Sequence, residues 1–304
     1  MNHFDKAGVV GAGTMGHGIA FLLAQAGIEV CLIDQDADAL EQGLANIDEL
    51  LESWIVKQKL TENAADDIKS NIFSCGDLEA LSECDLMIEA VSEDLDLKRH
   101  IFSLADKLID EHGLLASNTS SLSIASIADA VVNKDRVLGL HFFNPPPVMK
   151  LLEIIVHEKT SMYSVERAKE LGLLLRKECI IVNDSPGFAT SRLGISFALE
   201  AIRMLEQGIA GVQDLDSAMK LGYGHPMGPL MLSDWVGLDI RLAISEHLYR
   251  SLDSAVFKPP ELLRRMVRAG FLGKKSGTGF YEWDQGRHLG VSQSLLDLCH
   301  GLIT

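Results

Sequence analysis

The stretch Lys6-Ala7-Gly8-Val9-Val10-Gly11-Ala12-Gly13-Thr14-Met15-Gly16 decides the fold of this chain. Its first residues suit a short buried strand, and the glycines that follow have the spacing G-x-G-x-x-G. The first glycine of this pattern permits a tight turn, the second lets a pyrophosphate approach the backbone, and the third packs the next helix against its strand. We therefore expect a dinucleotide-binding turn made of Gly11, Ala12, Gly13, Thr14, Met15 and Gly16, with the helix N-terminus facing the phosphates.

The residues after this turn complete the unit. A helix is expected to run to about Ala26, with Gly27 at its end, and a second buried strand, Ile28 to Ile33, is expected to end at Asp34. Strand, turn, helix, strand and terminal acid in this order are far more specific than the glycines alone. A carboxylate at Asp34 can accept hydrogen bonds from the 2′-hydroxyl of NAD and repels the 2′-phosphate of NADP. No arginine stands nearby, so we expect NAD as the cofactor.

Helical and strand-like stretches alternate over the rest of the first 184 residues. This alternation predicts a Rossmann-type, doubly wound α/β fold with a mostly parallel sheet covered on both faces. Ligands of such sheets bind beyond the carboxyl ends of the strands. Three polar segments follow expected strands at these ends, namely Glu89 to Glu93, Ser117 to Ser121, and the segment that begins at His141.

A domain boundary is expected at Asp184-Ser185-Pro186-Gly187, since Ser185 suits an N-cap and Pro186 a first helical residue. Residues 1–184 would form the NAD-binding domain and residues 185–304 an all-helical C-terminal domain that forms one wall of the substrate cleft. Helices are expected from Pro186 to Gly208 and at Val212–Lys220, Leu238–Leu252 and Pro260–Ala269. Because this domain is small and rich in apolar residues, we expect it to join two copies into a homodimer.

The segment from His141 to Glu153 points to chemistry. His141 ends an apolar run, Pro145, Pro146 and Pro147 prevent that strand from continuing, and a second apolar run leads to Glu153. Such a turn can bring Glu153 beside His141. A carboxylate against an imidazole fixes its tautomer and favours a general base that works near neutral pH. The alternative is a buried histidine paired with an acid for stability alone.

Composition narrows the choice of partner and location. A net charge of -16 argues against nucleic acid or an anionic membrane as a partner. The uncharged stretch from Ala7 to Ile28 carries its glycines at the positions of the dinucleotide pattern, which argues against a membrane segment. The sequence has no clustered histidines and cysteines at the spacing of a metal site, so we expect no metal. The scattered cysteines favour reduced thiols in a cytoplasmic protein; they are Cys31, Cys75, Cys84, Cys179 and Cys299.

Taken together, these motifs resemble the 3-hydroxyacyl-CoA dehydrogenase family, most closely its short bacterial members that act on 3-hydroxybutyryl-CoA. The resemblance covers nearly the whole chain and implies reversible, NAD-dependent oxidation of a (3S)-3-hydroxyacyl-CoA. It rests on ordered blocks, namely Val10–Gly16, Ser117–Leu122, His141–Glu153, Asp184–Phe188, and Gly228-Pro229 with Asp234, Gly237, Leu238 and Asp239.

The resemblance also implies residue roles. His141 resembles the catalytic base, Glu153 its partner, and Ser120 the hydroxyl that contacts the reacting oxygen of the substrate. We expect Asn144 to donate to the same developing carbonyl oxygen. Further positions match cofactor or CoA contacts, with Glu93, Lys98 and Lys275 on the cofactor side and Lys57 for CoA. Ser191 departs from the family pattern, which commonly has asparagine there; serine could still reach the substrate through a water.

Two other functions remain open from the sequence. A dehydrogenase of a free hydroxy acid or sugar acid would keep the glycine turn and His141 but would not need lysines for CoA. A non-catalytic, NAD-responsive protein could reuse the same fold. The presence of both His141 and Glu153 argues against the second of these. The acyl-chain length is left open.

Overall fold

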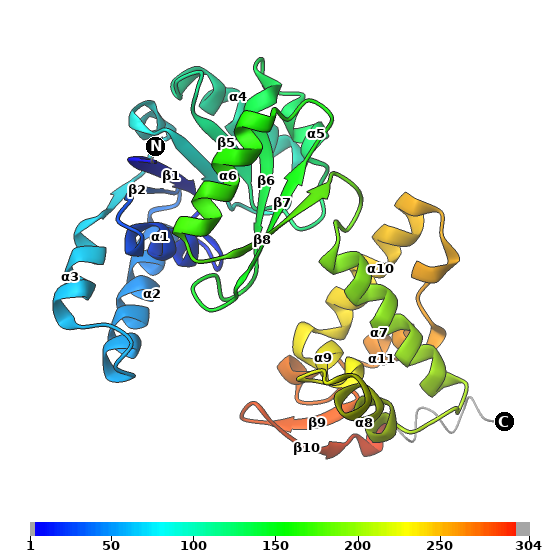
Figure 1. The fold of residues 1–304 in the computed structure, drawn as a ribbon. Helices are drawn as coiled ribbons and strands as arrows, with labels where there is room; N and C mark the ends of the chain where they lie inside the picture. The colour runs from blue at the N-terminus through cyan, green and yellow to red at the C-terminus, as the bar shows by residue number, and fades with distance from the viewer. Residues whose placement is uncertain (1–3, 296–304) are drawn as a thin grey trace. The chain divides into compact units, whose positions relative to one another are not determined.

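The computed structural model describes residues 4–295, which fall into two compact units that meet in sequence between Phe188 and Ala189 (Figure 1). This division lies just after the boundary expected at residues 184 and 185. The first unit is built on one eight-stranded sheet with the strand order β3-β2-β1-β4-β5-β6-β7-β8. Its strands are β1 Lys6–Val10, β2 Glu29–Ile33, β3 Ile72–Cys75, β4 Leu86–Glu89, β5 Leu114–Ser117, β6 Val137–Phe142, β7 Leu151–Val156 and β8 Glu178–Asn183.

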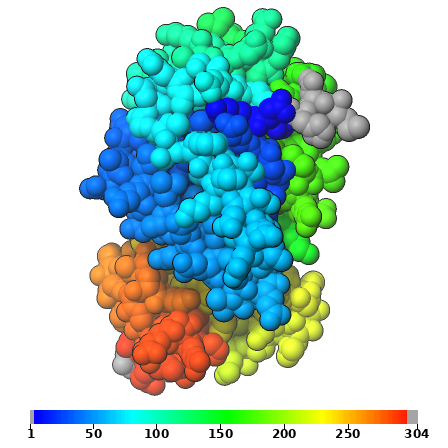
Figure 2. All heavy atoms as spheres, turned by 90° about the vertical axis from the view of Figure 1, so that its left-hand side faces the viewer, coloured from blue at the N-terminus to red at the C-terminus, as the bar shows by residue number. Residues whose placement is uncertain are grey.

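Helices cover both faces of this sheet, as the alternating sequence predicted. One apolar cluster packs α1, α2, α3 and α6 against one face, and a second packs α4, α5 and the short 3-10 segment η1 against the other (Figure 1). These elements are α1 Gly16–Gln25, α2 Ala37–Val56, α3 Glu62–Ser70, η1 Leu78–Glu83, α4 Leu95–Leu108, α5 Ile124–Ala128, η2 Lys134–Arg136 and α6 Met162–Leu174. On the side of the first unit shown in Figure 2, α2 and α3 form the blue to light-blue surface. The expected doubly wound, mostly parallel fold is confirmed.

The pair β6 and β7 departs from the parallel arrangement and runs antiparallel. The proline-rich turn between them causes this, because prolines cannot donate to a continuing ladder. Its register places His141 directly opposite Glu153. Every other paired neighbour in this sheet is parallel, so the ends of β1, β4, β5 and β6 point to one edge.

The second unit is mainly helical, as expected, but it is not all helical. It also contains an antiparallel hairpin of β9 Tyr281–Asp284 and β10 Arg287–Val291. Gln285 and Gly286 join the strands with φ of 45° and 81°, the left-handed backbone that two-residue hairpin turns need. Its other elements are α7 Thr190–Glu206, α8 Val212–Tyr223, α9 Pro229–Val236, α10 Leu238–Leu252, η3 Ala255–Phe257, α11 Glu261–Arg268 and η4 Lys274–Ser276.

The start of α7 also differs from the expectation. Pro186 is not a first helical residue and Ser185 is not an N-cap, because the helix begins at Thr190. Gly187 and Phe188 take left-handed φ values of 75° and 45°, so the chain turns once more before the helix. Phe188 is buried in the core of the first unit, which holds this extra turn in place.

Candidate active site

The glycine turn has the geometry that its sequence predicted. Gly11 has a φ of 102°, and a side-chain carbon there would lie 2.8 Å from the backbone of Ala90. A side-chain carbon at Gly16 would lie 1.7 Å from the carbonyl oxygen of Gly11, so the third glycine lets α1 pack against the turn. Apart from its own chain neighbours, a carbon at Gly13 would meet no atom of residues 4–295 within 4 Å. The open space at Gly13 is where the pattern requires room for a pyrophosphate.

The N-terminus of α1 is available to an anion, because Met15 at its N-cap position makes no side-chain cap. Asp34 lies beside the turn, where its Oδ2 accepts a hydrogen bond from the backbone N of Ala12 at 2.9 Å and its Oδ1 accepts one from Asp36 N at 3.0 Å. These two bonds fix the carboxylate at the end of β2, the position at which a ribose acceptor is expected.

A cavity of about 390 Å³ opens at the same edge of the sheet. Its size falls within the range of small-molecule sites, roughly 300–1,000 Å³, and most of its lining is apolar. It does not contain His141, so it suits the nucleoside half of a dinucleotide rather than the reacting atoms. Its lining includes Gly11, Gly13, Asp34, Gln35, Leu78, Val91, Ser92, Leu97 and Ile101. The glycine turn, the uncapped helix and this cavity together fit NAD.

His141 and Glu153 meet across the β6–β7 pair, with 2.7 Å between His141 Nδ1 and Glu153 Oε2. Glu153 is fully buried and His141 nearly so. The ring of Phe143 lies 4.5 Å from the imidazole, and the ring of Phe188 lies 5.9 Å from it, measured between centroids. The carboxylate favours the proton on Nδ1, so Nε2 is left as the basic nitrogen. Within residues 4–295, Nε2 has no hydrogen-bond partner.

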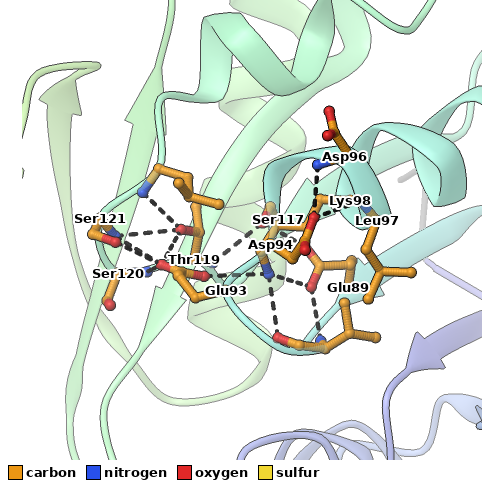
Figure 3. Close-up of polar contacts among 12 residues, drawn as sticks. Glu89, Glu93, Asp94, Asp96, Leu97, Lys98, Ser117, Thr119, Ser120 and Ser121 are labelled. Atoms are coloured by element: carbon orange, nitrogen blue, oxygen red, sulfur yellow. Dashed lines mark hydrogen bonds and ion pairs between the residues drawn. The ribbon is translucent and has the colours of Figure 1, made fainter.

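The ends of β4 and β5 are joined by the polar network drawn in Figure 3. Glu93 Oε1 accepts hydrogen bonds from Thr119 Oγ1 at 2.5 Å, from the backbone N of Ser120 and Ser121 at 3.1 Å each, and from Ser121 Oγ at 2.9 Å. Burial disfavours the charged form of Glu93, but the bonds from Thr119 and the charge of Lys98 outweigh it and lower the pKa of Glu93 below its usual value. Glu93 is therefore a carboxylate that fixes the Thr119–Ser121 segment.

The residues expected to contact the substrate oxygen lie at these strand ends. Ser120 is exposed just after β5, and its hydroxyl has no hydrogen-bond partner among the described residues. Asn144 is exposed two residues after β6, and it lines a second cavity, of about 410 Å³, with Thr14, His17 and Pro145. Both side chains can therefore reach a ligand.

Two residues at these strand ends make contacts to which the sequence analysis assigned no role. Asn118 links two strand ends, because its backbone N donates to Glu89 O at 2.8 Å and its Oδ1 accepts from Phe142 N at 2.9 Å. Its place inside the Ser117–Ser121 segment was the available signal. Glu89 is fully buried and pairs with Lys98; an acid that ends an apolar strand was the signal there.

The structure gives the local surroundings of four other predicted site residues. Lys98 is 1% exposed and bonds to Glu89 at 2.5 Å, so its ammonium faces the protein. Lys57 is exposed after the end of α2 and donates to Ser53 Oγ at 2.8 Å. In the second unit, Lys275 pairs with Asp239 at 2.6 Å, and Ser191 lies in the first turn of α7.

The described residues hold no group of three or more histidine, cysteine or acidic side chains that could bind a metal ion. No helix in residues 4–295 is both long and apolar enough to cross a membrane. Cys31, Cys75, Cys84 and Cys179 are free thiols, and Cys299 lies outside the described residues.

Comparison with known proteins identifies the family. The model of the "3-hydroxyacyl-CoA dehydrogenase, NAD binding domain" matches residues 6–185, and that of the "3-hydroxyacyl-CoA dehydrogenase, C-terminal domain" matches residues 187–283. The chain is 41% identical over 280 residues to the 3-hydroxybutyryl-CoA dehydrogenase of Clostridioides difficile, covering 92% of this chain and 100% of that protein. It is 40% identical over 283 residues to the mitochondrial hydroxyacyl-coenzyme A dehydrogenase of Mus musculus, covering 90% of each.

The crystal structure of the (S)-3-hydroxybutyryl-CoA dehydrogenase of Ralstonia eutropha has a similar fold, with a TM-score of 0.89 and 39% identity over 93% of this chain and 100% of that one. The resemblance inferred from the motifs is thereby confirmed. The chain belongs to the 3-hydroxyacyl-CoA dehydrogenase family.

Proposed function

We propose that this protein catalyses the reversible, NAD-dependent oxidation of a (3S)-3-hydroxyacyl-CoA to the 3-ketoacyl-CoA, with a short-chain substrate such as 3-hydroxybutyryl-CoA. The family makes it an oxidoreductase with an N-terminal NAD-binding domain. The observation that carries the proposal is the 2.7 Å contact between His141 and Glu153, in the same unit as the dinucleotide turn. Relatives named for 3-hydroxybutyryl-CoA support the short chain.

The residues at the strand ends supply the proton chemistry. Bound NAD supplies the acceptor for the hydride that leaves C3 of the substrate. His141 Nε2 takes the proton of the 3-hydroxyl group, and Glu153 stabilises the imidazolium that forms. General-base help of this kind is worth about 10²–10⁴ in rate. The side chains of Ser120 and Asn144 donate hydrogen bonds to the oxygen that becomes a carbonyl.

The remaining binding roles are inferences from the family likeness. Gly11 to Gly16 and Asp34 bind NAD, and Glu93 lies on the cofactor side. Lys98 supports Glu93 from within the protein, because its ammonium is buried against Glu89. The exposed Lys57 attracts the phosphates of CoA. Ser191 and Lys275, both in the second unit, contact the substrate and the nucleotide. Because Asp34 repels a 2′-phosphate, we expect at least a tenfold preference for NAD over NADP, about 1.4 kcal/mol. Equal catalytic efficiency with both cofactors would contradict this assignment.

A homodimer and a cytoplasmic location complete the proposal. Large apolar side chains of the second unit that are strongly exposed support association through this unit; they are Leu193, Leu221 and Tyr223, with exposed fractions of 72%, 86% and 79%. The free thiols Cys31, Cys75, Cys84 and Cys179 support a reducing compartment. Light scattering that gives the mass of one chain at micromolar concentration would contradict the dimer.

The decisive experiment measures NADH oxidation with 3-ketoacyl-CoA substrates of increasing chain length, with free 3-keto acids and sugar acids as a parallel series. We expect turnover with the CoA thioesters and a maximum at short chain length. Turnover of free acids without turnover of any acyl-CoA would identify the alternative dehydrogenase. NADH binding without turnover of any substrate would favour a non-catalytic, NAD-responsive protein.

A further inference from the structure

Glu89 ends β4 and its side chain is 0% exposed. One carboxylate oxygen, Oε1, accepts hydrogen bonds from Lys98 Nζ at 2.5 Å and from the backbone N of Val91 at 2.7 Å. The other, Oε2, accepts one from Ser117 Oγ at 2.6 Å (Figure 3). A carboxylate enclosed in this way cannot touch substrate or cofactor, so any part it has in the reaction acts through its partners.

Lys98 connects Glu89 to a second carboxylate. It is 1% exposed, and its Nζ lies 2.5 Å from Glu89 Oε1 and 3.4 Å from Glu93 Oε2. Charges at this depth are tolerated when they neutralise one another, whereas removing one partner leaves an uncompensated buried charge. In other proteins, apolar residues of similar volume often replace a buried ion pair without loss of stability. Unlike an apolar pair, the charged pair places the ammonium of Lys98 where it attracts the carboxylate of Glu93.

Two routes lead from Glu89 to the segment that carries Ser120. Along the first, Lys98 holds Glu93, and Glu93 Oε1 accepts from the backbone N of Ser120 at 3.1 Å. Along the second, Ser117 donates to Glu89 and its Oγ accepts from the backbone N of Thr119 at 3.2 Å. The first route fixes the backbone N of Ser120, and the second fixes that of Thr119, the residue before it. The Ser120 hydroxyl has no partner among the described residues.

We propose that Glu89 is a positioning residue for the dehydrogenation, which holds the Ser120 hydroxyl in place through Lys98, Glu93 and Ser117. The inference rests on the proposed function, in which Ser120 contacts the reacting oxygen. A displacement of about 1 Å at such a contact can lower the rate by up to about 10². Glu89 therefore controls turnover from a position that no ligand reaches.

The first test compares Glu89→Gln with Asp94→Ala in the full-length protein. Asp94 directly follows Glu93 in the chain but caps α4, with its Oδ1 accepting from Asp96 N and Leu97 N. For Glu89→Gln we expect turnover to fall at least tenfold, with the NADH dissociation constant changed less than threefold. Amide hydrogen exchange without ligands should become at least tenfold faster in the peptide covering residues 117–122. Asp94→Ala should lower the melting temperature yet leave both readouts within about twofold.

The second test adds Lys98→Met, alone and together with Glu89→Gln. The double variant lacks the buried ammonium that Glu89→Gln deprives of its nearest carboxylate, so its melting temperature should exceed that of Glu89→Gln. Its turnover should stay at least tenfold below wild type, because Glu93 has lost its anchor. Recovery of turnover together with melting temperature would overturn the proposal, as would normal exchange and turnover in Glu89→Gln. If the wild type turned over no 3-ketoacyl-CoA, the proposed function would fail, and the exchange comparison would still decide whether Glu89 holds the segment.

Discussion

Both units bury carboxylates, but they give them different partners. In the first unit Glu153 faces the imidazole of His141, and Glu89 faces the ammonium of Lys98. In the second unit Asp234 accepts hydrogen bonds from the backbone N of Phe280 and Tyr281 and from Trp283 Nε1. Asp216 in turn accepts from the backbone N of Leu230 and Met231 and from the Tyr281 hydroxyl. No ion pair involves Asp216 or Asp234 among the described residues.

This difference teaches that burial of an acid does not by itself indicate catalysis. A carboxylate beside a titratable or cationic group can stabilise a charge that changes during a reaction. A carboxylate surrounded by neutral N–H and O–H donors fixes the backbone that supplies them. Asp234 thus attaches the β9 strand to α9, although it belongs to one of the blocks that carry the family resemblance. This division predicts effects on turnover that decrease from His141, the base, to Asp234 in the second unit.

The largest effect should follow from His141→Gln. Removing the base leaves the 3-hydroxyl proton without an acceptor, so turnover should fall by a factor on the order of 10² or more. NADH binding, measured by fluorescence titration, should change less than threefold, because His141 does not line the nucleoside cavity. A loss of less than tenfold would mean that another group accepts the proton.

Glu153→Gln should lower turnover by roughly ten- to a hundredfold. Glutamine has nearly the same shape, but its neutral amide stabilises an imidazolium less and can present its NH₂ to Nδ1, which selects the wrong tautomer. The measurement is turnover together with urea unfolding, since a purely structural acid would reduce stability and leave the turnover of folded molecules intact. Reduced stability with intact turnover would mean that Glu153 has a structural role, like Asp216 and Asp234 in the second unit.

Much of this site was predictable because the signals are local. The glycine turn, Asp34 and the opposition of His141 and Glu153 each follow from residues close in sequence. The three prolines are an example, because they forced the β6–β7 turn that sets the register. The hairpin at β9 and β10 was missed even though Tyr281-Glu282-Trp283 alternates and Gln285-Gly286 suits a two-residue turn. Helices were expected throughout the rest of this domain, so the segment from Tyr281 to Val291 was not recognised as a pair of strands.

Other features could not be predicted because they depend on packing in three dimensions that local sequence rules do not contain. Lys98 was expected on the cofactor side from its position in a motif, whereas the packing of α4 buries its ammonium against Glu89 at the end of β4. The start of α7 was misplaced because Ser185 and Pro186 satisfy the local rules for a helix start. Phe188, buried in the core of the first unit, overrides those rules.

Lys177 is a buried cation of the first unit whose hydrogen-bond partners are neutral. It therefore tests whether neutral partners indicate a structural role in this unit as well. Its Nζ donates to the carbonyl oxygens of Pro146 and Met149 at 2.6 Å each, and burial lowers its pKa. Because its partners are neutral carbonyl oxygens, Lys177 supports the proline turn and does not take part in proton transfer. Lys177→Met should therefore lower the free energy of unfolding by about 1–2 kcal/mol and change turnover less than about threefold. A tenfold loss of turnover with an unchanged free energy of unfolding would show that neutral hydrogen-bond partners do not indicate a purely structural role.

The smallest effect on turnover should come from Asp234→Asn, which nevertheless weakens the second unit. The amide NH₂ of asparagine would face the donors Tyr281 N and Trp283 Nε1, and unsatisfied buried donors cost about 1–3 kcal/mol each. Urea unfolding at pH 7 should show a loss of about 2 kcal/mol, while turnover per folded molecule stays within about twofold. Tyr281→Phe, which removes one donor to Asp216, provides a milder control in the same cluster.

The loss of unfolding free energy in Asp234→Asn should depend on pH, which further distinguishes a buried acid with neutral donors from one beside a charged partner. Burial is the main cause that raises the pKa of Asp234 to about 6, with the neighbouring Asp216 charge adding to it and the hydrogen bonds opposing it. Because the folded pKa lies above the unfolded value of about 3.9, protonation favours the folded state. That stabilisation is complete below about pH 4 and is lost as the pH rises through 6. The difference in unfolding free energy between wild type and Asp234→Asn should therefore shrink by roughly 2 kcal/mol from pH 4 to pH 7. A difference that stayed constant or grew over this range would mean that Asp234 ionises normally, and neutral donors alone would then suffice to hold a buried charge.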